Sequence, residues 1–173
     1  MKMSAEDLND LEKKILLVEI VSCRELLAAD SNGFSDPYVL FKMGSKTLHK
    51  TEKVTKKLNP VYTSEHNNMF LLDCSVNELF VEEGGVLVEV MDWDRGFGND
   101  DELGSVFVSA KSLYKCKKKE YRLDPPPGKN ENAGYVTIQT SEITESERDS
   151  VKNGTPISKV AEDLVLSSSE EVC

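Results

Sequence analysis

The 173-residue chain lacks the features that most secreted, membrane-spanning or disulfide-rich proteins need. No apolar run approaches the ~18 residues that would span a bilayer. The first residues also lack the apolar segment of a signal peptide, so we expect a cytoplasmic protein. The four cysteines lie far apart and form no C-x-x-C pair. This spacing predicts reduced thiols rather than a disulfide framework or a zinc site.

Catalytic motifs are missing as well. The sequence has two histidines, His49 and His66, and it contains no G-x-S-x-G elbow, Walker loop or H-E-x-x-H motif. Its basic stretches have no interleaved aromatic residues that would stack on bases. We therefore expect neither an enzyme nor a nucleic-acid-binding protein.

Aspartate, in contrast, is concentrated in two short segments. Asp30 and Asp36 delimit the first segment. The second contains Asp92, Asp94, Asp100 and Asp101. Each segment follows an apolar, β-like run, and carboxylates gathered at strand ends repel one another unless a cation lies between them. Ca²⁺, which takes about 6–8 oxygen ligands, suits such a cluster. Ordinary turn chemistry explains one segment equally well, but two such segments together favour calcium.

Short apolar or alternating runs between turn residues predict an all-β protein, an eight-stranded antiparallel β sandwich. The expected strands are Ile15–Cys23, Pro37–Met43, Lys46–Val54, Val61–His66 (with an extension through Phe70–Leu72 left open), Gly85–Met91, Glu102–Val108, Glu120–Leu123 and Gly134–Thr140. We expect the sandwich to occupy residues 14–141, after an N-terminal extension over 1–13. Residues 142–173 are acidic and Ser-rich with few large apolar residues, which predicts a disordered tail.

The order of the strands predicts where the aspartates meet. If every connection reverses the chain, the first, third and fifth connections lie at the same end of the sandwich. The first and fifth are the two acidic segments. Alternation places Val86, Val88 and Val90 on the core face, and Asp92 and Asp94 continue that face past the strand end. We therefore predict calcium-binding loops at one end.

These residues resemble the C2 domain family, the calcium- and phospholipid-binding module found in protein kinase C and synaptotagmins. The matching stretches are Leu16–Leu26 with Asp30, Gly33–Val39, Leu58–Pro60, Val90–Arg95 and Leu103–Gly104. The chain starts at the strand that enters the first acidic loop, and the strand at 134–140 closes the sandwich. That order is similar to the family's second circular permutation, its type II topology.

The resemblance implies specific calcium ligands. It assigns Asp30, Asp36, Asp92 and Asp94 by position, with the main-chain carbonyls of Ala29 and Trp93 as further ligands. The fifth carboxylate is Asp101 if it is counted from Gly104, and Asp100 if it is counted from Asp92. The third loop is one residue longer than the usual family pattern, so both alternatives stay open.

Several residues near these loops are candidates for lipid contact. Phe34 and Phe97 occupy loop tips, where an exposed ring gains nothing in water, and we expect them to insert into membrane. Arg95 can meet a lipid phosphate from the same side. The basic stretch along the third strand and its following loop is either an anionic-lipid site or a solvated edge strand defended by lysine. Its lysines are Lys50, Lys53, Lys56 and Lys57.

The function predicted from the sequence is calcium-dependent binding to anionic phospholipid membranes, with phosphatidylserine and phosphoinositides as candidate lipids. Calcium would neutralise the acidic rim and bridge it to a lipid phosphate or carboxylate. We expect a monomer that is recruited reversibly from the cytoplasm. One alternative is a protein-interaction scaffold with a weak or vestigial calcium site. The other is a simple calcium buffer. Separately, the acidic tail is a candidate site for a protein partner.

Overall fold

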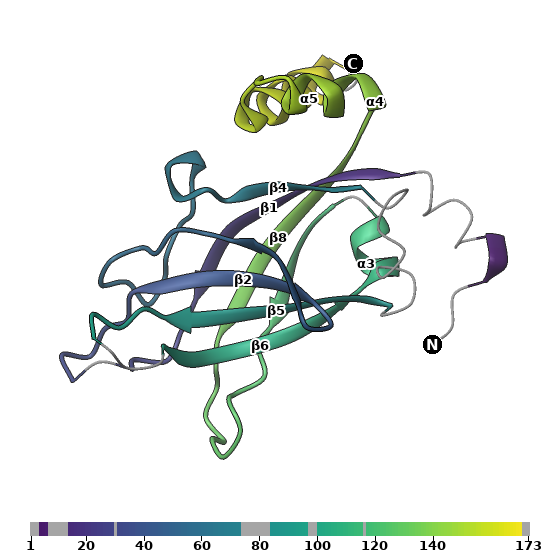
Figure 1. The fold of residues 1–173 in the computed structure, drawn as a ribbon. Helices are drawn as coiled ribbons and strands as arrows, with labels where there is room; N and C mark the ends of the chain where they lie inside the picture. Colours follow the sequence, from purple (N-terminus) through teal and green to yellow (C-terminus); the bar gives the residue numbers. More distant parts are fainter. Residues whose placement is uncertain are drawn as a thin grey trace.

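The computed structural model describes residues 4–6, 14–29, 31–73, 84–96, 100–115 and 117–170. For residues 168–170 it describes the backbone alone. Asp30 and Phe97, two of the predicted site residues, lie outside these ranges. The described strands form two four-stranded antiparallel sheets that pack face to face (Figure 1). The structure thus confirms the prediction of an eight-stranded antiparallel β sandwich.

Sheet A contains the first and last strands side by side, in the order β4-β1-β8-β7. Its strands are β1 (Ile15–Arg24), β4 (Met69–Asp73), β7 (Lys118–Arg122) and β8 (Tyr135–Ile143). Pairing of the last strand with the first is what the type II order requires.

Sheet B has the order β3-β2-β5-β6. Its strands are β2 (Pro37–Met43), β3 (Lys46–Lys50), β5 (Gly85–Asp92) and β6 (Asp101–Ser109). β6 runs directly into the short helix α3 (Ala110–Tyr114).

The core lies between the sheets and is built from alternate residues of the central strands. Leu16 and Val18 from β1 pack in one cluster with Phe41 and Val88 from sheet B. Phe41 is fully buried, and its ring centroid lies 4.9 Å from that of Phe70 on β4. Burying a side chain of this size contributes roughly 1.5–3 kcal/mol. The period-2 pattern therefore identifies the face that each strand turns inward.

The fourth strand lies at the extension through Phe70–Leu72 that the sequence left open, and not at Val61–His66. It is β4, whereas Val61 makes only an isolated bridge to Ser22. The chain then forms a short 3₁₀ turn, η1 (Ser64–His66), where the N–H of Thr63 donates to Nδ1 of His66 (3.0 Å). Local side-chain hydrogen bonds of this kind compete with the sheet ladder for the backbone.

The third strand also ends earlier than predicted, at Lys50 rather than Val54. The side chain of Thr51 accepts a hydrogen bond from the N–H of Val39 (2.9 Å), in place of a further ladder carbonyl. The remaining strand ends differ from the predicted ones by a few residues at most.

The segment predicted to be a disordered tail forms two helices in the structure, α4 (Glu145–Lys152) and α5 (Ile157–Glu170). Thr144 caps α4 reciprocally with Glu147, an arrangement known as a capping box. Helical spacing places Ile157, Val160, Ala161 and Leu164 of α5 on one face, whereas Val165 and Leu166 are exposed. That face meets the outer side of sheet A, and Val160 is buried there with Leu17 (Figure 1).

None of the helices in the described part of the chain is both long and apolar enough to cross a membrane.

Candidate functional site

Two of the aspartate-bearing connections lie against each other at one end of the sandwich. We name them loop 1 (residues 25–36) and loop 3 (93–100). The main-chain N–H of Asp36 donates to Oδ1 of Asp92 (2.7 Å), and the N–H of Trp93 donates to the carbonyl of Asp36 (3.0 Å). The register of β2 and β5 produces this contact, because it pairs Pro37 with Asp92.

Loop 2, residues 51–63, joins them there. The N–H of Lys56 donates to Oδ1 of Asp36 (2.7 Å), and the N–H of Lys57 donates to the carbonyl of Ser35 (2.9 Å). Lys56 has a positive φ of 53°, an uncommon conformation for a residue with a side chain. The prediction that the first, third and fifth connections share one end is confirmed.

Loop 1 is held in shape by its own hydrogen bonds. Ser35 is fully buried, and its hydroxyl donates to the carbonyl of Leu27 (2.8 Å) and accepts from the N–H of Ala29 (3.0 Å). The side chain of Asn32 accepts from the N–H of Phe34 (3.1 Å), and Gly33 supplies the positive φ of 83° that the turn needs. Phe34 is 45% exposed as a result, as expected for a loop tip.

Asp100 closes loop 3 through both carboxylate oxygens. It accepts from the N–H of Asp94 (3.0 Å) and from the hydroxyl of Tyr38 (2.6 Å). The Tyr38 hydrogen bond lowers the pKa of Asp100, and burial followed by this same hydrogen bond raises the pKa of Tyr38. Asp101 opens β6 opposite Asp92 and is exposed. Both candidates for the fifth carboxylate therefore lie at the loop end, and Asp100 is the one bonded within loop 3.

The side-chain oxygens at the loop end of the sandwich are of the chemical type that binds calcium. Asp36, Asp92, Asp94 and Asp100 offer carboxylate oxygens, which hard cations prefer. Asp92 is only 2% exposed. Among the residues that the structure describes, however, no three carboxylate, imidazole or thiol side chains lie close enough together to hold a metal. Three of the four carboxylates accept main-chain N–H groups instead, so calcium binding would require them to turn toward a shared point.

Two of the predicted lysines lie over aromatic rings beside the loops. Nζ of Lys53 lies 2.9 Å from the centroid of Trp93, and Nζ of Lys50 lies 4.7 Å from the centroid of Tyr38. Lys56 and Lys57 are exposed on loop 2, and Arg95 is exposed on loop 3. Nothing in the sequence pattern marks these two rings as supports for lysines. Each ring lies one or two positions from a predicted calcium ligand in the sequence. This spacing does not indicate which lysine would contact which ring.

Comparison with known proteins identifies one family. A family model described as the C2 domain matches residues 14–154. The multiple C2 and transmembrane domain-containing protein of Drosophila melanogaster is 31% identical over 150 residues, which cover 85% of this chain and 15% of that protein. The eye isozyme of protein kinase C from the same organism is 32% identical over 127 residues, which cover 65% and 17%. The chain therefore spans less than a fifth of the length of these curated relatives.

Solved structures share the architecture. A C2 domain of plant extended synaptotagmin 1 aligns with a TM-score of 0.55 at 22% identity, covering 77% of this chain and 98% of that one. The calcium-bound pair of C2 domains from extended synaptotagmin 2 aligns with a TM-score of 0.57 at 20% identity, covering 76% and 46%. At these identities the likeness establishes the fold alone.

Proposed function

The chain belongs to the C2 domain family, and from that premise we propose that it binds anionic phospholipid membranes in a calcium-dependent manner. The observation that carries the proposal is the direct contact of loops 1 and 3, in which the N–H of Asp36 donates to the carboxylate of Asp92. This hydrogen bond brings one aspartate of each acidic segment, Asp36 and Asp92, together at one end of the sandwich, which supports the proposal. Carboxylates so close together favour a bound cation.

The proposed calcium ligands are the aspartates of the two loops and two main-chain carbonyls. They are Asp30, Asp36, Asp92, Asp94, one of Asp100 and Asp101, and the carbonyls of Ala29 and Trp93. Bound Ca²⁺ supplies positive charge and open coordination positions for a lipid phosphate or carboxylate. Among the described residues, no lysine or arginine forms an ion pair with Asp36 or Asp94, so a bound ion would not have to displace a cationic side chain from either carboxylate.

The lipid headgroup would meet the lysines that flank the loops. Lys50 and Lys53 lie over rings at the same end as the aspartates, with Lys56 and Lys57 on the adjoining loop. Each lysine near an anionic surface contributes about 1 kcal/mol. The exposed ring of Phe34 would enter the interface, and the proposal extends to Phe97 from its position in the sequence. Arg95 would add a contact to phosphate.

Sedimentation with vesicles tests this proposal. Vesicles of phosphatidylcholine alone and vesicles with added phosphatidylserine are compared, with calcium and with chelator. We expect the chain to pellet only with the anionic vesicles and only with calcium. The double variant Asp92→Asn with Asp94→Asn should lose this binding, whereas Asp163→Asn, an exposed aspartate on α5, should keep it. Equal pelleting with and without calcium would contradict the proposal.

A protein-interaction module with a weak calcium site is the second candidate. The observation in its favour is that both oxygens of Asp100 already accept protein hydrogen bonds. Calorimetric titration separates the two functions, because a ligand that binds only the folded loops also raises the melting temperature. Heat and stabilisation without vesicle binding would instead indicate a calcium buffer.

A further inference from the structure

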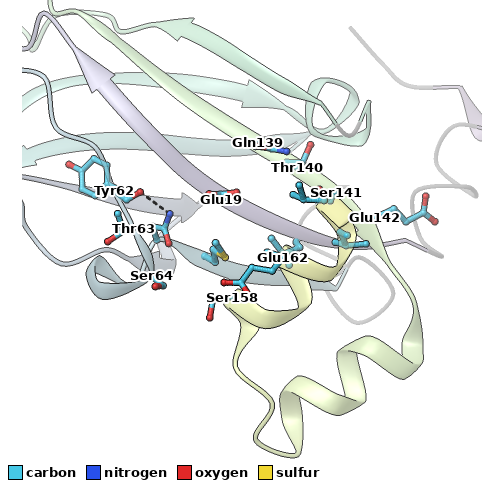
Figure 2. Close-up of a pocket in the computed structure, with 16 residues that line it drawn as sticks. Glu19, Tyr62, Thr63, Ser64, Gln139, Thr140, Ser141, Glu142, Ser158 and Glu162 are labelled. Carbon is cyan, nitrogen blue, oxygen red and sulfur yellow. Dashed lines mark hydrogen bonds between the residues drawn. The ribbon is translucent and has the colours of Figure 1, made fainter. Parts of the chain in front are cut away.

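A groove of about 640 Å³ lies between α5 and the outer face of sheet A, on a different side of the molecule from the three loops (Figure 2). Figure 2 shows Glu19 from β1, Gln139 from β8 and Glu162 from α5 around it. Its apolar lining includes Leu17 and Leu164. The volume falls in the range of small-ligand and peptide-anchor sites.

The groove has acidic and neutral side chains and no basic ones. Among the described residues that line it, Glu19, Glu142 and Glu162 are acidic, and none is lysine, arginine or histidine. Glu142 pairs with Lys14 at 2.8 Å. Burial raises the pKa of Glu19, and the charge of Lys118 and a hydrogen bond from Asn68 offset only part of that effect. A cation in the groove would favour the ionised form of Glu19.

Asn68 provides an independent observation. It is 1% exposed and lines the groove. Its side-chain amide donates to the carbonyls of Ile20 (2.9 Å) and Tyr62 (3.2 Å), which fixes the orientation of the amide. Its Oδ1 is buried and accepts from no donor among the described residues. A buried acceptor without a donor is destabilising, so a small rearrangement that lets a donor from the groove reach this oxygen would be favoured.

We infer that the groove binds a short basic and apolar segment of a protein partner. One lysine or arginine side chain would lie near Asn68, Glu19 and Glu162, and aliphatic neighbours would cover Leu164 and Val165. An arginine suits the site well, because its planar group donates to two acceptors at once. The acidic lining disfavours anionic lipid, and no three carboxylates gather there for a metal among the described residues.

The surface beyond the groove suits a peptide chain better than a small molecule. Val165 and Leu166 on α5 are 61% and 63% exposed, so apolar surface continues along the helix past the groove. A peptide with aliphatic residues on both sides of its basic side chain can cover both. Binding energy at interfaces is concentrated in a few buried residues, among which arginine is enriched, and the contacts around them mainly exclude water.

A defined peptide pair tests the inference. The probe is acetyl-Leu-Leu-Arg-Leu-Leu-amide, and its control carries glutamate in place of arginine. Titration of the full chain, followed by amide NMR shifts, should show changes at residues 158–165 and at Glu19, with the arginine peptide binding about tenfold tighter. Saturating calcium should leave this binding unchanged, which separates it from the loops. Absence of binding, or shifts confined to loops 1 and 3, would overturn the inference.

Two charge reversals on one helix provide the matched control. Glu162 lines the groove, whereas its neighbour Asp163 does not. Glu162→Lys should weaken the arginine peptide at least about fivefold, and Asp163→Lys less than about twofold, because only the first places like charge in the groove. Glu19→Gln, nearly isosteric, should weaken it severalfold. If the two charge reversals weaken the peptide equally, the binding is non-specific charge attraction, and the proposal is overturned.

Discussion

The outer faces of the two sheets differ in how far they are buried and in the side chains that they carry. On sheet A, Leu17 and Ile143 are buried because α5 covers them with Val160. On sheet B the corresponding face is open, and it carries charged side chains such as Lys42 and Glu89, which pair at 2.6 Å. The difference begins in the strands themselves. β1 has four consecutive buried residues, whereas β5 alternates beyond Val86.

This difference shows how the chain separates its two candidate sites. A strand that is apolar on both faces needs a layer on each side, and here α5 supplies the second layer. The groove beneath α5 exists because that layer covers the sheet incompletely. Sheet B alternates and needs no second layer, and Lys56 and Lys57 are exposed at its loop end.

The largest expected effect is on stability, when a leucine is changed to alanine on the outer face of each sheet in turn. Leu17→Ala should cost roughly 2–4 kcal/mol of unfolding free energy, because it leaves a cavity under α5. Leu87→Ala, on the open face of the central strand β5, should cost about 1 kcal/mol, since that side chain is only partly buried. Urea unfolding of both variants measures the difference. Equal losses would show that α5 does not protect sheet A.

A second comparison concerns the two sides of α5. Val160→Ala should destabilise the protein by roughly 1–2 kcal/mol, since Val160 is 5% exposed. Val165→Ala, 61% exposed on the same helix, should stay within about 0.5 kcal/mol. The two substitutions make the same change in helix propensity, so thermal unfolding isolates the packing. Similar melting temperatures would argue against docking of α5.

A smaller effect is expected at the ion pair between α4 and β4. Arg148 and Asp73 pair at 2.9 Å, and their side chains are 19% and 13% exposed. Arg148→Ala should speed hydrogen exchange of the α4 and α5 amides, because local opening of the helices becomes easier. Exchange of the β5 amides should stay unchanged and acts as the internal control. Uniform acceleration throughout the protein would contradict a local role.

The smallest effect should appear at the loop end of sheet B. Tyr38→Phe removes the main cause of the lowered pKa of Asp100, so that pKa should rise. A carboxyl with a lowered folded-state pKa stabilises the protein above its unfolded pKa, and this contribution disappears as pH falls through the folded value. As pH falls from the unfolded-state pKa of Asp100 to its folded-state pKa, the variant should therefore lose less stability than the parent protein. Carboxyl NMR titration checks it, and an unchanged pKa would exclude the Tyr38 hydroxyl as the cause.

The sequence by itself predicted the features that depend on local periodicity and chain reversal. Alternation identified the core face of β5, with Asp92 as its last residue and Asp94 just beyond it, and antiparallel order placed three connections together. The sequence did not decide between Val61–His66 and the extension through Phe70–Leu72 for the fourth strand, because Thr63, His66 and Asn68 use side-chain hydrogen bonds that a hydropathy pattern does not record.

Only the tertiary structure decided what lies on the outer face of sheet A. The apolar residues of 142–173 are too few to predict a packed element from composition, and α5 gains its stability from Leu17 and its neighbours rather than from its own sequence. The buried acceptor of Asn68 likewise depends on strands and a helix that are distant in the chain. Contacts between distant segments depend on three-dimensional packing, and a local sequence pattern does not contain them.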